Sequence, residues 1–188
     1  IYIKRKQIKM SDFTKCVHFT LQYEGIDTSP GGAYSDHPND RGGPTKYGIC
    51  LMFAKDVRDM NLMDKDGNRV ITKEDIKKLT FDDAIKIYKK YFWDRFNLDS
   101  VEDNQKAFLV FDACVNHGYR GATKIVQKAL NKCGSNLLVD GVYGPKTRNA
   151  LINADSQKFI KAFQEVRTDY YYAIVRNNPS QKVFLKGW

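Results

Sequence analysis

Carboxylates and a hydroxyl gather around a glycine-rich stretch near the start of the chain. Glu24 precedes this stretch, and Asp36, Asp40 and Thr45 lie within it. Hydrolysis of a glycosidic bond needs a carboxylic acid to protonate the leaving oxygen. It usually needs a second carboxylate or polar group as well, to hold water or to stabilise the transition state. These residues could supply both functions.

A structural interpretation competes with the catalytic one. At the end of a helix beside Phe19 and Tyr23, Glu24 would be partly shielded from water, and such a carboxyl group holds its proton near neutral pH. Aspartate, however, is a favoured turn residue, because its side chain bonds to nearby backbone. Glu24 could equally be a solvated helix-end residue and the aspartates only turn formers. Spacing alone favours this structural interpretation.

The hydrophobic pattern predicts a mainly α protein, a helical bundle with a glycine-rich loop or small β-hairpin near its start. Apolar residues at intervals of three and four predict a helix over 13–23, capped by Ser11 or Asp12. Residues 25–48 are rich in Gly, Pro and Asp and predict the loop or hairpin. Further helices are predicted at 50–61, 80–96, 104–117, 122–132, 145–153 and 156–177. At this spacing the aromatic runs 91–93 and 170–172 favour the core over a sugar-stacking surface.

Composition and motifs limit the classes of partner that we expect for this protein. The 188 residues carry a formal net charge of +9, which attracts anionic partners. We expect no nucleic acid partner, because no helix-turn-helix, zinc or aromatic-platform motif is present. We expect no membrane insertion, because no apolar run approaches the roughly 18 residues that a spanning helix needs. No cysteine pair has metal or redox spacing, so buried free thiols are expected at Cys16, Cys50, Cys114 and Cys133.

The basic segment 1–10 is not followed by the apolar stretch of a signal peptide. Because the sequence opens on Ile and Met10 could be the natural start, we expect this segment to be an extension outside the fold. The chain would be made in the cytoplasm and would act beyond it after release or export by another route.

Four ordered motifs carry a resemblance to a known family. Glu24-Gly25, followed by GGAYSDHPNDRGGPTKYGI at residues 31–49, resembles the signature of glycoside hydrolase family 108. The segments YKKYFWD at 88–94 and FDACVNHG at 111–118 are similar to family segments in the same order. The segments QKAL at 127–130 and DGVYGPKT at 140–147 resemble a peptidoglycan-binding companion domain. The resemblance covers about residues 13–188.

This resemblance implies an α+β lysozyme-like fold and an N-acetylmuramidase, as in phage endolysins and bacterial secretion activator proteins. Such an enzyme hydrolyses the β-1,4 bond between N-acetylmuramic acid and N-acetylglucosamine in peptidoglycan. The implied domains are a catalytic domain at 11–118 and a peptidoglycan-binding-like domain at 119–188. We expect a monomer at the cell wall or in the periplasm. The alternative is a non-catalytic wall-binding or secretion-assembly protein that retains the fold.

The resemblance also implies roles for single residues. Glu24 is the expected catalytic acid, with Asp40 and Thr45 as catalytic candidates that position water or substrate. Residues 26–30 are inserted relative to the family pattern, which leaves the separation of Glu24 and Asp40 open. Candidate substrate-binding residues are Asp36, Tyr47 and Asn116. Asn116 could instead be a buried helix-end residue bonded to backbone, and His117 is expected to be structural.

A second motif could bind a metal. Residues 64–75 follow the 12-residue pattern of an EF-hand calcium loop. Arg69, however, stands where Gly usually makes the sharp turn, and Asp75 is shorter than the usual bidentate Glu. Calcium binding and a metal-free loop both remain open, and the hydrolytic chemistry requires no cofactor. The candidate ligands are Asp64, Asp66, Asn68, Val70 and Asp75.

Overall fold

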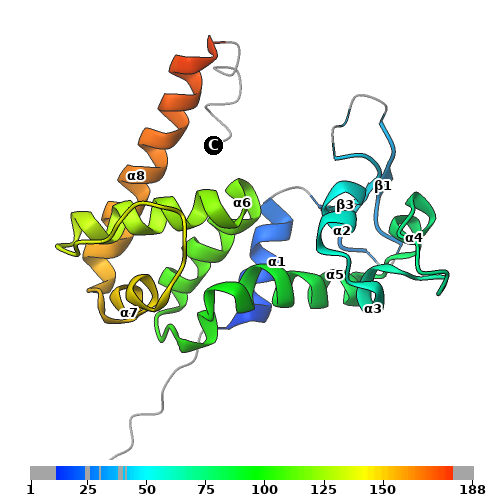
Figure 1. Ribbon diagram of the computed structural model, residues 1–188, viewed down its shortest axis with the longest axis horizontal. Helices are drawn as coiled ribbons and strands as arrows, with labels where there is room; N and C mark the ends of the chain where they lie inside the picture. Colours follow the sequence, from blue (N-terminus) through cyan, green and yellow to red (C-terminus); the bar gives the residue numbers. More distant parts are fainter. Residues whose placement is uncertain (1–11, 24–25, 30, 38–39, 41, 180–188) are drawn as a thin grey trace, which may run out of the picture. The chain divides into compact units, whose positions relative to one another are not determined.

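The computed structural model describes residues 12–23, 26–29, 31–37, 40 and 42–179. These fall into two compact units. One is Phe13–Arg95, and the other contains Asp12 and the described residues from Phe96 onward. Figure 1 traces the elements of each unit along the chain.

A small antiparallel sheet occupies the glycine-rich region of the first unit. Its strands are β1 (Tyr34–Ser35), β2 (Thr45–Lys46) and β3 (Ile49–Cys50), in the order β1-β2-β3. Tyr47 and Gly48 join β2 to β3 with φ angles of 51° and 75°. Two positive φ angles in a two-residue loop are typical of a type I′ turn, which matches the twist of paired strands. The predicted hairpin near the N-terminus is confirmed.

The described part of this unit also contains five short α-helices, and the ends of some of them carry local sequence signals. They are α1 (Phe13–Tyr23), α2 (Leu51–Val57), α3 (Met60–Met63), α4 (Lys73–Lys78) and α5 (Phe81–Tyr88). The helix predicted over 50–61 is interrupted, because Arg58 adopts a φ of 51° that ends α2. The sequence interpretation also missed α4, which starts with a capping box between Thr72 and Asp75.

The helix predicted over 80–96 changes its winding after α5. It continues as a π-helix, η1 (Lys89–Trp93), and then as a 3₁₀ turn, η2 (Asp94–Phe96). Asp59, only 9% exposed, accepts hydrogen bonds from Lys90 Nζ at 2.6 Å and from the Tyr91 hydroxyl at 2.7 Å. The Asp59 carboxylate therefore ties η1 to the junction of α2 and α3. Trp93 is fully buried, as the core interpretation of this aromatic run expected.

Long helices dominate the second unit. After the 3₁₀ turn η3 (Leu98–Ser100) come α6 (Asn104–Lys132), α7 (Pro145–Asn153) and α8 (Ser156–Asn177). The two helices predicted at 104–117 and 122–132 form one element, which is kinked at Gly118 (φ 66°, ψ 168°). The aromatic run at 170–172 is mixed, since Tyr171 is buried whereas Tyr170 and Tyr172 are exposed. Among the helices described, none is both long and apolar enough to span a membrane.

A buried lysine joins α6 to the end of α7. Lys106 is 3% exposed, and its Nζ donates to the carbonyls of Leu151 at 3.0 Å, Ile152 at 3.3 Å and Ala154 at 2.9 Å. The last carbonyls of a helix have no partner within the helix. The ammonium group of Lys106 therefore caps α7 from a neighbouring helix.

Candidate active site

Glu24, the expected catalytic acid, lies outside the described residues. The described chain runs up to Tyr23 and resumes at Ile26. The Ile26 amide donates to the Leu21 carbonyl at 2.9 Å, so the chain is held close to the last turn of α1 directly after Glu24 and Gly25 in sequence.

The inserted segment 26–30 contacts the β-hairpin through its described residues. A Cβ atom added to Gly48 would lie 2.8 Å from Ile26 Cδ1, so Ile26 packs directly on the β2–β3 turn. The Tyr47 hydroxyl donates to the Ser29 carbonyl at 2.9 Å. A Cβ atom on Gly32 would lie 2.4 Å from the Tyr47 ring, so only glycine fits beside that ring. The insertion therefore folds back onto the hairpin that begins with Thr45.

Tyr47 organises this contact from the core. It is 1% exposed, and its own carbonyl accepts a hydrogen bond from the Tyr88 hydroxyl at 3.2 Å. Burial, together with the nearby negative charge of Asp27, raises the pKa of Tyr47. Tyr47 thus offers a substrate almost no surface and instead fixes the hairpin turn. Its substrate-binding role stays a prediction.

Asp40 lies in the loop that joins β1 to β2. Its Oδ1 accepts from the Gly42 amide at 2.8 Å, and its backbone carbonyl accepts from the Gly43 amide at 3.0 Å. The same loop anchors α2, because the Leu51 and Met52 amides donate to the carbonyls of Pro44 and Gly42 at 2.9 and 3.0 Å. These amides belong to the first turn of α2 and have no partner within the helix. The exposed Asp40 carboxylate is thus held on an anchored loop.

Thr45 and Asp36 lie at the two ends of that loop. Thr45 pairs with Ser35 across the strands, and its Oγ1 donates to the Gly43 carbonyl at 2.9 Å. Asp36 follows Ser35 and is exposed, with Tyr34 Oη at 3.5 Å and Lys73 Nζ at 4.0 Å. The structure therefore gathers Asp36, Asp40 and Thr45 in a single β1–β2 connection.

Asn116 belongs to the second unit. It is exposed, and its Nδ2 donates to the Asp112 carbonyl one helical turn earlier at 2.9 Å. The backbone bond agrees with the structural interpretation, whereas the exposure differs from the buried position which that interpretation expected. Its substrate-binding role stays a prediction.

A polar network beside the Gly118 kink was not predicted from sequence. Arg167 pairs with the Asp112 carboxylate, and its Nε donates to the Tyr171 hydroxyl at 3.3 Å. That hydroxyl lies 3.3 Å from His117 Nε2. Burial, and secondly the positive charge of Arg167, lowers the pKa of His117 to about 4. His117 is therefore a neutral structural residue at physiological pH, as expected for a lone histidine.

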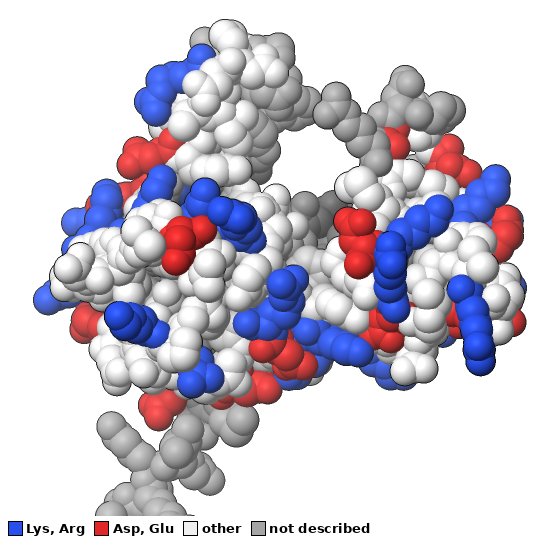
Figure 2. All heavy atoms as spheres, in the orientation of Figure 1, with Lys and Arg blue, Asp and Glu red and all other residues white. Residues whose placement is uncertain are grey.

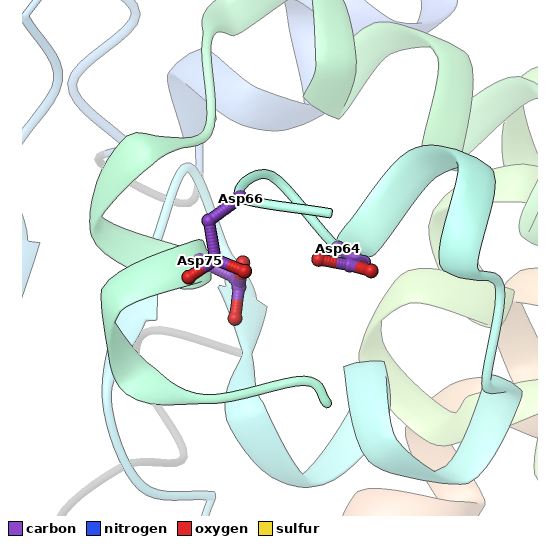
Figure 3. A group of neighbouring side chains, drawn as sticks. All are labelled: Asp64, Asp66 and Asp75. Atoms are coloured by element: carbon purple, nitrogen blue, oxygen red, sulfur yellow. The ribbon is translucent and has the colours of Figure 1, made fainter. Parts of the chain in front are cut away.

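Three carboxylates of the EF-hand-like loop meet between α3 and α4. Oxygens of Asp64, Asp66 and Asp75 all lie within 4.8 Å of one another, and Figure 3 shows the three side chains together. Asp64 accepts from the amides of Gly67 and Arg69, each at 2.8 Å. Arg69 adopts a φ of 65°, the left-handed conformation that Gly usually supplies at this position. The loop keeps an EF-hand-like turn despite the substitution.

Both carboxylate oxygens of Asp75 accept hydrogen bonds from backbone amides. Oδ1 accepts from the Lys65 amide, and Oδ2 accepts from the Thr72 amide, each at 2.8 Å. Burial alone would raise the pKa of Asp75, but these hydrogen bonds hold it below its usual value. The residue therefore caps α4 rather than leaving both oxygens for a cation. Calcium binding stays a prediction for this loop.

Comparisons with known proteins agree with the motifs. Residues 17–118 match the model of the family described as glycosyl hydrolase 108, and residues 121–188 match that of a predicted peptidoglycan domain. The solved structure of SagA from Brucella abortus is similar, with a TM-score of 0.65 and 26% sequence identity over 94% of this chain and 86% of that chain. A search of the curated proteins found no match.

The two matched regions meet near the kink of α6, at residues 118–121, whereas the two compact units divide between Arg95 and Phe96. The domain boundary between residues 118 and 119 stays a prediction. Because the first region spans more than half of the sequence, the chain belongs to glycosyl hydrolase family 108, a family whose membership implies hydrolysis of peptidoglycan.

Proposed function

We propose that this protein is an N-acetylmuramidase. It hydrolyses the β-1,4 bond between N-acetylmuramic acid and N-acetylglucosamine, with Glu24 as general acid. It acts at the cell wall or in the periplasm after release or export.

The observation that carries this proposal is the contact of the segment after Glu24 with the β-hairpin. Ile26 packs on the β2–β3 turn and Ser29 accepts from Tyr47, so the insertion turns back toward the strand that begins with Thr45. An acid must act across the scissile bond from the group that handles water or the developing positive charge. Folding of the insertion onto the hairpin is compatible with an acid and its partner in one site.

Asp40 is the better partner for Glu24 in this proposal. It carries a carboxylate, which can activate water or stabilise positive charge, and its loop is anchored on the first turn of α2. The Thr45 hydroxyl donates to the Gly43 carbonyl, so it can accept a hydrogen bond from water but cannot carry charge. In this assignment Thr45 positions water and Asp40 supplies the negative charge.

Purified cell walls test the proposal. Wild-type protein should clear a wall suspension and generate new reducing ends, and Glu24→Gln should abolish both while its circular dichroism and wall binding stay unchanged. Asp40→Asn should reduce the rate by at least about tenfold, and Thr45→Val by less. Glu102→Gln changes an exposed glutamate of the other unit and should be fully active.

Three outcomes would contradict the proposal. Wall binding without reducing ends by the wild type would favour the non-catalytic wall-binding or secretion-assembly alternative. Full activity of Glu24→Gln would remove Glu24 from the mechanism. Release of free amino groups without reducing ends would point to cleavage of the peptides instead.

A further inference from the structure

A groove runs between the second half of α6 and α8. Its volume is about 450 Å³, within the range of small-ligand sites. Ile125 and Val166, both buried, contribute an apolar floor, and Ala173 and Gly121 are small residues of the same lining. All of these residues belong to the second unit, which contains the matched peptidoglycan domain.

Cationic side chains line the rim of this groove. Lys124, Lys128 and Lys132 follow one another at four-residue steps along α6, about 6 Å apart along its axis. Arg176 lies on the α8 side. Lys132 is paired with Glu165 at 2.9 Å, whereas among the described residues no ion pair involves Lys124, Lys128 or Arg176. Figure 2 shows Lys and Arg side chains over the region that α6 and α8 occupy in Figure 1.

Two other side chains complete the lining. Tyr170 is 38% exposed. Its ring packs edge to face against that of His117, with the two ring centroids 4.8 Å apart. His117 in turn contacts Tyr171 within the network at the Gly118 kink, so the kink supports one wall of the groove. Asp169 is the single carboxylate of the lining. The groove thus combines several cations, one anion, an aromatic edge and an apolar floor.

We propose that this groove binds the stem peptide of peptidoglycan through its carboxylates. The inference rests on the proposed function, because it takes peptidoglycan as the substrate. Within that polymer the lactyl carboxyl of muramic acid is consumed by the amide bond to the peptide, so the glycan strand is neutral. The carboxylates belong to the peptides, and cationic side chains complement them.

The details of the lining favour a peptide over a phosphate polymer. Alanine methyl groups of the stem match the apolar floor of Ile125 and Val166 and the small side chain of Ala173. The free ammonium of the diamino acid has a partner in Asp169, which would repel a continuous row of phosphates. Binding of the peptide by this groove would deliver the attached glycan to the enzyme.

Calorimetry with the full chain and an N-acetylated stem tetrapeptide tests this inference. The wild type should bind the peptide saturably, with an affinity that falls as salt rises. Lys128→Glu should weaken binding about fivefold, and Lys124→Glu with Lys128→Glu about 25-fold, since each exposed charge pair contributes up to about 1 kcal/mol. Ala173→Phe should weaken binding by filling the groove without changing its charge. Lys146→Glu, an exposed lysine on α7 away from the lining, should bind like the wild type.

Several results would overturn it: no saturable binding by the wild type, an equal loss in Lys146→Glu, tighter binding of a glycerol phosphate oligomer than of the peptide, or NMR shifts that map outside the groove. Reducing-end release from glycan strands stripped of peptides measures the proposed function separately. The groove variants should retain that activity. Failure of the wild type in that assay rejects the muramidase, whereas failure of peptide binding alone rejects the groove.

Discussion

The hydroxyl of Tyr47 donates a hydrogen bond to the carbonyl of Ser29 at 2.9 Å, which joins the β2–β3 turn to the segment that follows Glu24. Tyr47 can reach this segment because its left-handed backbone in the turn directs a buried ring into the fold, and because Gly32 leaves room for that ring. One tyrosine thus connects the two halves of the candidate active site.

Tyr47→Phe should therefore affect activity more than stability. The ring is retained, so we expect a loss of about 1 kcal/mol in the free energy of unfolding, as for one hydrogen bond. The rate of reducing-end release should fall several-fold, because the segment after Glu24 loses an attachment. Tyr172→Phe is the matched control, since Tyr172 is exposed on α8 in the other unit. Equal rates for the two variants would contradict the positioning role.

Gly48 is a second constraint on the hairpin. Its φ is 75°, and an added Cβ would lie 2.5 Å from Tyr88 Oη and 2.8 Å from Ile26 Cδ1. Gly48→Ala should lose about 3 kcal/mol or more of unfolding free energy, from left-handed strain and from overpacking together. Urea denaturation measures the loss.

Gly67→Ala separates the two causes. Gly67 has a similar φ of 77°, but nothing lies within 4 Å of its added Cβ. Strain alone predicts about 1–2 kcal/mol there. If Gly48→Ala costs no more than Gly67→Ala, Gly48 is required only for its φ angle and the contact with Tyr88 is unimportant. Combining Gly48→Ala with Tyr88→Phe should recover part of the loss.

Helices whose ends carry local signals were predictable from sequence. α7 and α8 match their predicted bounds, because Pro145 starts α7 and the Asp155 side chain caps α8 by accepting from the Lys158 amide. The Thr72–Asp75 capping box could have revealed α4, but the EF-hand-like pattern over the same residues concealed it. The glycine-rich region was predicted as loop or hairpin, and Tyr47-Gly48 resembles the turn signals that favour a hairpin.

Features that depend on tertiary contacts were not predictable. The break at Arg58 and the π-helix η1 have no local signal, and η1 depends on Asp59 from far along the chain. The family-like motif that contains Tyr47 did not reveal that its side chain is buried. Its burial follows from the packing of Gly32 and Tyr88, which a linear pattern does not contain. The contact of the inserted segment with the β-hairpin is also tertiary, so it could not be predicted from the sequence.

Substitution of Lys106 should destabilise the second unit more than most other substitutions there. Lys106→Met retains the apolar stem but leaves the carbonyls of Leu151, Ile152 and Ala154 without their donor. We expect a loss of about 3 kcal/mol in unfolding free energy, because buried acceptors without partners are costly. Lys146→Met, an exposed change, should cost less than about 0.5 kcal/mol. Equal stabilities would mean that water replaces the ammonium group.

His117 should make stability depend on pH in a defined window. Its pKa is about 4 in the folded protein, against an ordinary value of 6.5, so the unfolded chain binds the proton more tightly. Its contribution is complete above pH 6.5, is lost as the pH falls from 6.5 to about 4, and changes little below that. The full shift corresponds to about 3 kcal/mol, and because His117 is partly exposed, solvent screening should reduce the loss to roughly 1–2 kcal/mol.

The variant His117→Phe isolates this contribution, because it retains a ring against Tyr170 and Tyr171 but cannot titrate. Urea denaturation from pH 7.5 to 3.5 should show a shallower decline for His117→Phe than for the wild type, with the difference developing between pH 6.5 and 4. Parallel curves for His117→Phe and the wild type would show that His117 binds its proton equally well in the folded and unfolded states. Burial and the charge of Arg167 would then have no effect on its protonation.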